Sequence, residues 1–525
     1  MPEEDLVHHD VPPVSPRAGA SPTGAPSPGH AIVVGVLAAL AGLMFGLDTG
    51  VIAGALRFIG NDFNASPRTQ EWIVSSMMAA AAVGSLIAGT ISFRFGRRRA
   101  LLGSSLLFLV GSLISALAPS VAVLIIGRIF LGFAVGIAAF TAPLYISEVS
   151  AVAQRGSMIA CYQLMMTGGI FLSYVTDGML ADGAHWRWML GLMTVPATVF
   201  LIGCLFLPDS PRWLMMRGEN ARARRVMRYL RPTPQQADRE ISDIATELTR
   251  GRSEGFSFFR KNANFRRSVG LGIVLQIMQQ LTGINVLMYY APKVFQAANF
   301  GASAAGWATA LIGLINLVAT CVAIVTVDRW GRRPLLLLSC AIMTGSMLLA
   351  GGLVEYGGHD TVAQIAMVGS LLVFVLGFAI GAGPLVWTLC AEIQPLRGRD
   401  FGIVCSTFTN WATNWAVSNT FLSVLDTLGE AHTFWLFAAM NALFIGITLL
   451  YVPETKGVSL EDIESHLLAA GPCAIWVTAP FRAHPGSPRA PLPEMKVSWR
   501  RLFEKRQHSE AFIIFYQSVI SDSFL

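Results

Sequence analysis

Phe95-Gly96-Arg97-Arg98, a basic motif between two apolar segments, recurs about 235 residues later as Trp330-Gly331-Arg332-Arg333. Three further motifs of the first part of the chain also recur in the second part, in the same order and at similar distances along the sequence. They are Thr49-Gly50-Val51 and Thr282-Gly283-Ile284, Glu148 to Arg155 and Glu392 to Arg399, and Pro208-Asp209-Ser210-Pro211-Arg212 and Pro453-Glu454-Thr455-Lys456. One match would carry little weight, but four in one order predict that the chain consists of two repeated halves.

The composition is that of a membrane protein. Of the 525 residues, 53% are hydrophobic and 13% are charged, whereas soluble domains carry about 25% charged residues. Twelve apolar runs reach the roughly 20 residues that a helix needs to cross a bilayer. They lie at 31–59, 71–93, 100–119, 121–145, 157–180, 187–207, 268–298, 303–327, 335–356, 363–391, 401–425 and 432–452. We therefore predict an all-α membrane protein with twelve transmembrane helices, in two six-helix halves of parallel topology related by an axis along the membrane normal.

Basic residues gather in alternate loops. They are Arg94, Arg97, Arg98, Arg99, Arg155, Arg212, Arg222, Arg224, Arg225, Arg228, Arg329, Arg332, Arg333, Arg397 and Arg399. By the positive-inside rule, this pattern predicts a multi-pass protein of the plasma (inner) membrane with both termini in the cytoplasm. The net charge of +6 is therefore a topology signal. Because no basic stripe with interleaved aromatic residues occurs, the sequence does not indicate nucleic-acid binding.

Composition also divides the chain into five segments. They are a disordered cytoplasmic leader at 1–30, an N-terminal six-helix half at 31–207, a cytoplasmic linker with short helices at 208–267, a C-terminal six-helix half at 268–452 and a cytoplasmic tail at 453–525. In the linker, Ser210-Pro211 and Thr233-Pro234 each place a capping residue before a proline at the first helical position. Gln236 is predicted to complete a capping box with Thr233. The tail beyond about residue 470 suggests no function.

Nothing in the sequence indicates catalysis. Six of the seven cysteines lie in apolar segments and none forms a CxxC pair, so we interpret them as small core residues. The absence of a Walker A loop argues against ATP as the driving force. No His/Cys/Asp cluster has the spacing of metal ligands. We predict a protein that is not an enzyme, binds no metal and needs no cofactor.

An unusually polar stretch, Gln279-Gln280-Leu281-Thr282-Gly283-Ile284-Asn285, lies inside the seventh apolar run. Amides at membrane depth are costly unless something hydrogen-bonds them. A polyhydroxylated ligand would do so; the alternative is that the amides bridge neighbouring helices. On an ideal helix Gln279 and Gln280 lie about 100° apart, and Asn285 lies about 140° from Gln280. We predict a helix break at Thr282-Gly283 that lets the three side chains converge.

One acid and one base stand out in the first half. Asp48 is the only acidic residue of the first apolar run, and Arg128 is the only basic residue well inside the fourth. Intramembrane acids are costly unless paired, and they are therefore candidates for function. When ionised, Asp48 would tie the two spans together through Arg128, and its protonation would loosen that contact. The alternative is a permanent structural ion pair.

Longer motifs identify the family that the chain resembles. They are GLDTGVIAGAL (46–56), QEWIVSSMM (70–78), APLYISEV (142–149), LPDSPRW (207–213), QQLTGINVLMYYAP (279–292), DRWGRRP (328–334), GPLVWTLCAEIQPLRGRDFGI (383–403), NWATNW (410–415) and PETKGVSLEDIE (453–464). From about residue 31 to 468 the chain resembles sugar porters of the major facilitator superfamily, especially the bacterial galactose–proton symporters. The resemblance implies the major facilitator fold and rocking of two halves around a midplane site.

The resemblance also implies roles for single residues. Asp48 and Arg128 would be the proton-coupling pair. Tyr289 and Tyr290 would form the outer gate that closes over bound sugar. Sugar contacts are implied at Gln163, Gln279, Gln280, Asn285, Asn316, Trp387 and Asn414, and Trp411 is a weaker candidate.

Charged residues at the cytoplasmic span ends are implied to act as gates. Glu148, Arg155, Glu392 and Arg399 resemble symmetry-related salt bridges that hold the outward-facing state. A further gate contact is implied near Asp328 and Arg332. The chain departs from the family at Phe93, because an acidic residue is common at that position.

We therefore expect proton-coupled uptake of a hexose, galactose or glucose, by a monomer whose partners are the monosaccharide, the proton and membrane lipids. Two alternatives stay open, namely an uncoupled sugar facilitator and a proton symporter of a pentose such as arabinose or xylose. A sugar sensor without transport would require a large signalling tail, and a drug exporter fits poorly with an amide-rich site.

Overall fold

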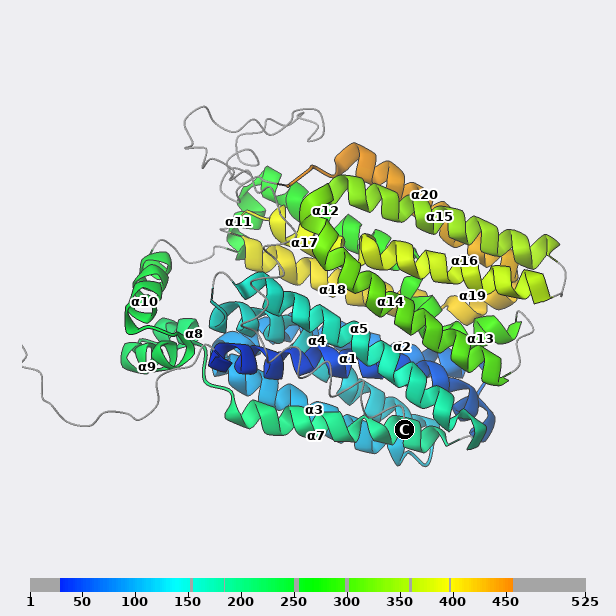
Figure 1. The fold of residues 1–525 in the computed structure, drawn as a ribbon, viewed down its shortest axis with the longest axis horizontal. Helices are drawn as coiled ribbons and strands as arrows, with labels where there is room; N and C mark the ends of the chain where they lie inside the picture. Colours follow the sequence, from blue (N-terminus) through cyan, green and yellow to red (C-terminus); the bar gives the residue numbers. More distant parts are fainter. Residues whose placement is uncertain are drawn as a thin grey trace, which may run out of the picture. The chain divides into compact units, whose positions relative to one another are not determined.

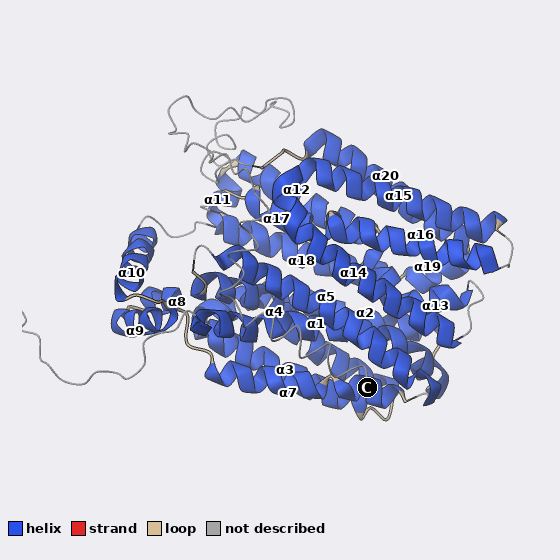
Figure 2. Cartoon of the chain, viewed as in Figure 1, coloured by secondary structure: helices blue, strands red, loops and turns tan. Residues whose placement is uncertain are grey.

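The computed structural model describes residues 29–151, 154–183, 185–249, 255–297, 302–357, 361–395 and 398–456. Residues 1–28 of the predicted leader and the predicted tail beyond residue 456 lie outside these ranges. The regular elements in the described ranges are all helices (Figure 2). This agrees with the prediction of an all-α protein.

The first half is a bundle of long helices. They are α1 (Gly29–Asp62), α2 (Pro67–Phe95), α3 (Arg97–Ala116), α4 (Val121–Val149), α5 (Arg155–Leu180), α6 (Trp186–Leu192) and α7 (Thr194–Phe206), with a 3-10 turn η2 (Ala181–Gly183) before α6. The short α6 and α7 follow one another as a single span, Trp186–Phe206. The described helices of this half therefore make six spans.

The second half repeats this plan with more interruptions. Its helices are α12 (Ala263–Leu281), α13 (Ile284–Ala297), α14 (Ala302–Trp330), α15 (Arg332–Tyr356), α16 (Thr361–Ile380), α17 (Ala382–Glu392), α18 (Arg399–Ser418), α19 (Phe421–Leu428) and α20 (Glu430–Tyr451). Two spans are broken helices, α12–α13 and α16–α17.

Eleven helical segments of the described chain are long and apolar enough to cross a membrane. The predicted run at 401–425 is not among them, although α18 and α19 occupy it. α18 buries polar side chains, including Asn410 and Asn414, and these reduce its mean hydropathy. With α18–α19 as the remaining span, the chain has the twelve spans predicted from its sequence.

α1, which carries Asp48, packs closely on α5 (Figure 1). A Cβ atom at Gly46 would lie 1.9 Å from the Met166 carbonyl oxygen, so a residue with a side chain would force the two backbones apart. α2 and α3 both pack on α4, which carries Arg128. The halves meet where α5 contacts α14, where α2 contacts α18 and where α1 contacts α13.

The linker contains α8 (Pro211–Met216), α9 (Asn220–Leu230), α10 (Pro234–Thr249) and α11 (Gly255–Lys261). Ser210 accepts a hydrogen bond from the Trp213 N–H, and Thr233 accepts one from the Gln236 N–H, so both predicted N-caps are confirmed. The capping-box prediction is wrong, because the Gln236 side chain donates to Glu240.

The linker helices α8–α10 lie against one end of the first half, which we call the linker end (Figure 1). The Trp213 indole donates to the Phe93 carbonyl oxygen at the end of α2, at 2.9 Å. The buried Arg231 guanidinium donates to the Val149 and Ser150 carbonyl oxygens at the end of α4. A cation at a helix C-terminus is favourable, so Arg231 holds the linker on α4. We call the other end of the helices the opposite end.

Apolar side chains also cover part of the outer surface. On α7, Val195, Val199 and Ile202 lie on one face and are 64%, 51% and 50% exposed. A soluble protein rarely exposes such a stripe, whereas lipid tails accept it. The surface thus fits a protein that spans a bilayer.

Candidate functional site

A break interrupts the polar stretch that the sequence singled out. α12 ends at Leu281, α13 begins at Ile284, and Gly283 between them has a φ of 89°, which favours glycine. Asn441 of α20 donates to the Thr282 carbonyl oxygen at 3.2 Å, which satisfies a backbone group freed by the break. The predicted break at Thr282-Gly283 is therefore confirmed.

The break brings two of the three predicted amides together. Asn285 Nδ2 donates to Gln280 Oε1 at 2.6 Å. Gln279 points elsewhere: its Nε2 donates to the Ala382 and Gly383 carbonyl oxygens at 2.8 and 3.1 Å. Those carbonyls lie where α16 gives way to α17, so Gln279 joins the two broken spans. Gln279 therefore bridges helices, while Gln280 and Asn285 bond to each other, and the interpretation that these amides bind a polyhydroxylated ligand stays a prediction.

Two buried amides that the sequence reasoning missed complete this network. Asn410 of α18 donates to Gln276 at 2.6 Å and to Gln279 at 2.9 Å. Gln276 lies three residues before Gln279, and Asn410 lies four residues before Asn414. A helical spacing from residues already chosen is the signal that would have found them.

The predicted gate residue Tyr289 contacts the same region. Asn414 Nδ2 donates to the Tyr289 hydroxyl oxygen at 3.4 Å, and Ser418 donates to Asn414 Oδ1 at 3.1 Å. Tyr290 donates to the Ser418 carbonyl oxygen at 3.2 Å. α13 and α18 are thus tied together by both tyrosines and by Asn414.

The other predicted sugar contacts are less closely joined. Gln163 is half-buried on α5, and Asn316 is buried on α14, which packs against α5. Trp387 on α17 is 41% exposed. Within the described residues, the hydrogen bonds given above do not include these three side chains, so their role in binding stays a prediction.

Trp411 is the weaker aromatic candidate, yet it lies deeper than Trp387. It is 2% exposed, and its ring centroid lies 5.3 Å from that of Phe45 on α1. Its indole Nε1 is buried and has no hydrogen-bond partner among the described residues. A buried N–H without a partner is costly, so this group is ready to donate to a ligand between the halves.

Asp48 and Arg128 form the buried ion pair that the sequence suggested. Arg128 Nη1 donates to Asp48 Oδ1 at 2.5 Å, and both side chains are fully buried. Asp48 Oδ2 and Arg128 Nη2 have no further hydrogen-bond partner among the described residues. Removing two charges from water is expensive unless all their hydrogen-bonding groups are satisfied. The pair is therefore satisfied only where Arg128 Nη1 meets Asp48 Oδ1, and the other carboxylate oxygen and the Nη2 group have no hydrogen bond among the described residues.

The pair lies near the amide region. The Tyr289 hydroxyl accepts from Asn414, and α13, which carries Tyr289, packs on α1, which carries Asp48. Tyr289 thus lies on a helix of the second half that contacts a helix of the ionic pair.

The repeated motifs converge at the linker end as two matching networks. In the first half, Glu148 accepts from Arg97 at 2.9 Å and from Ser210 at 2.5 Å. In the second half, Glu392 accepts from Arg332 at 3.2 Å and from Thr455 at 2.5 Å. Each network joins two helices of one half to the segment that follows that half. The internal repeat of the sequence is therefore a repeat of charge contacts.

These sequence features agree with comparisons to known proteins. The family described as "Sugar (and other) transporter" matches residues 34–467. The chain belongs to this sugar transporter family. Such a match covers both halves and the linker, so it applies to the whole membrane-spanning part.

Two relatives of this sugar transporter are similar over most of their length. The galactose-proton symporter of Escherichia coli (strain K12) is 52% identical over 433 residues, which are 82% of this chain and 93% of the relative. The arabinose-proton symporter of the same strain is 47% identical over 440 residues, 83% of this chain and 93% of the relative.

Solved structures with the same fold include the xylose transporter XylE from Escherichia coli. Its partially occluded inward open conformation has a TM-score of 0.72 and 28% identity, and covers 82% of this chain and 99% of that one. XylE, a proton:xylose symporter of the major facilitator superfamily, bound to 6-bromo-6-deoxy-D-glucose has a TM-score of 0.71 and 29% identity, and covers 83% and 98%. The transporter therefore has the major facilitator fold.

Arg155 and Arg399 do not make the predicted pairs in this conformation of the transporter. The carboxylates of Glu148 and Glu392 are bound by Arg97 and Arg332. Arg155 is exposed, and Arg399 lies within electrostatic range of Glu392. Because the pairing was predicted for a different conformational state, the gating role of these arginines stays a prediction. The Asp328 side chain lies outside the described residues.

Phe93 stands where an acidic residue is common in the family, and its ring contacts Arg97. The Cζ atom of Arg97 lies over the Phe93 ring, 4.5 Å from its centroid. Arg97 is almost fully buried, and a cation over an aromatic face is stabilised by the ring quadrupole. The transporter thus keeps a contact between these two positions without a carboxylate.

Proposed function

We propose that this protein is a proton-coupled symporter of a hexose, galactose or glucose, that takes up sugar by alternating access. The observation that carries the proposal is the buried Asp48–Arg128 pair, whose helix α1 packs on α13, where the Tyr289 hydroxyl accepts from Asn414. A permanent structural pair would need no such connection to a polar site. Relatives named for proton symport of galactose and arabinose support the same reaction class.

Coupling follows from the cost of a buried charge. With Asp48 ionised, the short bond to Arg128 holds α1 to α4. Once Asp48 is neutral, Arg128 loses its counter-charge and must find other acceptors, which changes the packing of both helices. The sugar side of this change is Tyr289, since α13 packs on α1 and the Tyr289 hydroxyl accepts from Asn414. Proton binding and sugar binding would therefore favour the same conformational change.

The binding site proposed for the sugar lies around Gln279, Gln280, Asn285 and Asn414. Amides offer both donors and acceptors, and a hexose presents a ring of hydroxyls that can act as either. Gln163, Asn316 and Trp387 would complete the site from neighbouring helices. A galactose-proton symporter among the relatives, and a XylE structure with a bound glucose derivative, favour a hexose.

The linker end is proposed to face the cytoplasm of a cell with an inner membrane. Basic residues crowd the linker, and they also follow α2 and α14. The positive-inside rule then assigns both termini to the cytoplasm and the opposite end to the outside. The protein would work as a monomer surrounded by lipid.

With this orientation, we infer that the described conformation faces inward. Hydrogen bonds that join the two halves within the described residues lie toward the opposite end, as between Tyr174 and the Met288 carbonyl oxygen at 2.7 Å. At the linker end, the Arg97–Glu148 and Arg332–Glu392 pairs each stay within one half. Tyr289 and Tyr290 would close the outer gate. The sugar would leave toward the linker end.

The test is transport by the purified protein in proteoliposomes with radiolabelled sugar. We expect Asp48→Asn to abolish accumulation of sugar driven by a proton gradient while sugar exchange persists. Asp62→Asn, at an exposed ion pair on the same helix, is the matched control and should accumulate sugar normally. Undiminished accumulation by Asp48→Asn would show that the pair is structural and that coupling lies elsewhere.

A pentose is the second candidate substrate, because the arabinose-proton symporter is 47% identical and XylE is a xylose transporter. The same assay with galactose, glucose, xylose and arabinose decides between the two. An uncoupled facilitator is less well supported, since it has no use for a buried carboxylate next to the sugar site.

A further inference from the structure

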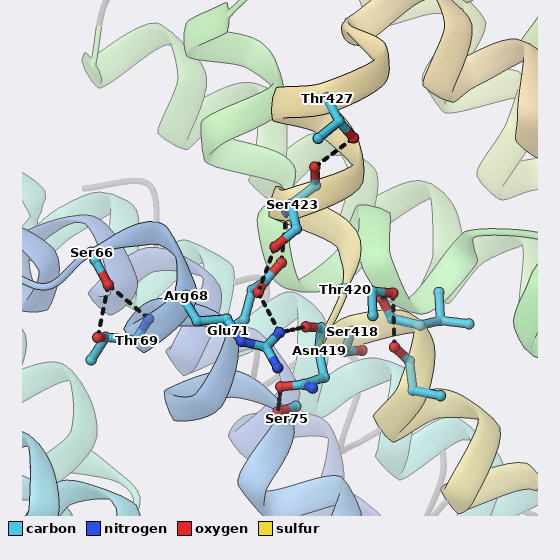
Figure 3. A network of polar contacts seen from close by, with 12 residues as sticks. Ser66, Arg68, Thr69, Glu71, Ser75, Ser418, Asn419, Thr420, Ser423 and Thr427 are labelled. Carbon is cyan, nitrogen blue, oxygen red and sulfur yellow. Dashed lines mark hydrogen bonds and ion pairs between the residues drawn. The ribbon is translucent and has the colours of Figure 1, made fainter.

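A polar network joins the two halves at the opposite end, far along α2 from the linker (Figure 3). Its centre is Glu71, whose side chain is fully buried. Glu71 accepts from the Ser423 N–H at 2.7 Å, from the Ser423 hydroxyl at 3.0 Å and from Arg68 Nη1 at 2.9 Å. Ser423 belongs to α19 of the second half, so a buried carboxylate of one half is satisfied by the other.

The first turns of α2 also hold the end of α18. Arg68 Nη1 donates to the Asn419 carbonyl oxygen at 2.6 Å, and the Ser75 hydroxyl donates to Asn419 Oδ1 at 3.0 Å. In addition, Lys293 of α13 donates to the side chain of Gln70. Gln70, Glu71 and Ser75 are the polar residues at the start of the motif 70–78, which the sugar and proton sites do not use.

The charges match the two helix ends that they meet. Asn419 is the C-terminal capping residue of α18, where free carbonyl groups favour a cation, and Arg68 lies there. Ser423 is the third residue of α19, where free N–H groups favour an anion, and Glu71 lies there. One Arg–Glu pair therefore satisfies the break between α18 and α19 from across the interface.

We propose that Arg68, Glu71, Ser75, Asn419 and Ser423 form a cross-half latch that closes the opposite end. The latch deepens the proposed function, because it needs the halves to alternate between two states. It acts as a gate and touches neither the sugar amides nor the Asp48–Arg128 pair. Its role is to set how much of the protein faces inward when no sugar is bound.

The energetic reason lies in Glu71. A carboxylate buried between the halves depends on every one of its partners. If the opposite end opens, α2 separates from α19, and water replaces Ser423 around Glu71. Closing reverses this exchange and adds hydrogen bonds to a charged group, each of which contributes more than a neutral one. Removing the charge should therefore shift the population toward the outward-facing state.

The experiment measures access to the interface from outside. Met78 lies on the α2 face that carries Glu71 and Ser75, at helical spacings of three and four residues, and it is fully buried. In the full chain carrying Met78→Cys, a membrane-impermeant maleimide is added outside cells, and labelling is followed by mass spectrometry. We expect Glu71→Gln to raise the labelling rate of this cysteine about tenfold, the effect of losing a hydrogen bond to a charged group.

Two comparisons separate the latch from general loosening. Asp62→Asn removes an ion pair from Arg187 that joins helices of the first half, and it should leave the labelling rate unchanged. The native Cys340, fully buried inside the second half, should stay unlabelled in every variant. An equal rise at Cys340 and at Met78→Cys would mean that Glu71 only stabilises the fold, and would overturn the proposal.

A milder substitution keeps the test decisive if Glu71→Gln folds poorly. The Arg68 side chain is 53% exposed, so Arg68→Gln disturbs little packing and should raise labelling of Met78→Cys by a smaller factor. Unchanged labelling in the folded variants of both Arg68 and Glu71 would refute the latch. Because the readout needs neither sugar nor a proton gradient, the latch can fail while the symport proposal stands, and the reverse.

Discussion

The Arg97 guanidinium is held between two unlike partners, the Glu148 carboxylate at 2.9 Å and the ring of Phe93 at 4.5 Å. The pair of Arg97 and Phe93 explains how the first half keeps a contact at the end of α2 without an acid. The ring offers attraction without a charge that must be desolvated. The linker also depends on Phe93, since the Trp213 indole donates to the Phe93 carbonyl oxygen.

Replacement of Phe93 tests this substitution directly. We expect Phe93→Ala to lower the melting temperature of the detergent-solubilised protein, because a partly desolvated cation–π contact contributes roughly 1 kcal/mol. Phe93→Asp, which offers Arg97 a carboxylate, should keep the melting temperature near that of the parent. Equal loss in both variants would mean that the ring matters only for packing.

The helix break depends on Gly283. A side chain there would have to adopt a φ of 89° and would place its Cβ 2.8 Å from the Phe437 ring. We expect Gly283→Ala to reduce the transport rate strongly, since the conformation alone costs about 1–2 kcal/mol. The control is Gly345→Ala, because a Cβ at that helical position meets no atom within 4 Å. Normal transport by Gly283→Ala would show that the break tolerates other geometries.

The amide pair of Gln280 and Asn285 should determine the affinity for sugar. We expect Gln280→Ala to raise the half-saturation concentration for sugar at least about tenfold, because a ligand hydroxyl would lose its partner. Gln394 is an equally buried amide that donates to the Ser268 carbonyl oxygen at 3.1 Å, away from the break. Gln394→Ala should leave the half-saturation concentration unchanged. The reverse pattern would move the sugar site away from α12.

The two repeated networks should differ in strength. The Arg97 and Glu148 side chains are 1% and 4% exposed, whereas Arg332 and Glu392 are 15% and 20% exposed. Removing one partner of a buried pair costs about 3–5 kcal/mol, and a pair that water partly reaches contributes less. Glu148→Gln should therefore lower the melting temperature more than Glu392→Gln. Equal effects would indicate that water reaches both networks alike.

Features that depend on local chemistry were accessible from the sequence. Hydropathy predicted the spans, and Gly283 beside Thr282 predicted the break because few other residues adopt its conformation. Asp48 and Arg128 were recognised because charges inside a membrane need a partner. The span at 401–425 shows the limit of hydropathy, since polar residues inside α18 weaken its apolar signal.

Features that depend on which helices meet were not accessible. Gln279 was expected beside Asn285, but it bonds to α17 because that helix begins next to it in space. The Arg partners of Glu148 and Glu392 lie 51 and 60 residues away, whereas the sequence favoured partners seven residues away. Glu71 gave no signal on its own, because its need for Ser423 appears only once α19 is placed against α2.

The gap between α12 and α13 has a consequence for engineering. Gln279 and Gln280 lie on α12, whereas Asn285, Tyr289 and Tyr290 lie on α13, so the proposed sugar contacts lie on both sides of the gap and the proposed gate lies on one side. Substitutions of Gln279 and Gln280 should change which sugar is accepted, and substitutions of Tyr289 and Tyr290 should change turnover. Directed evolution could therefore screen one library of variants at Gln279 and Gln280 and another at Tyr289 and Tyr290, and then combine the selected variants.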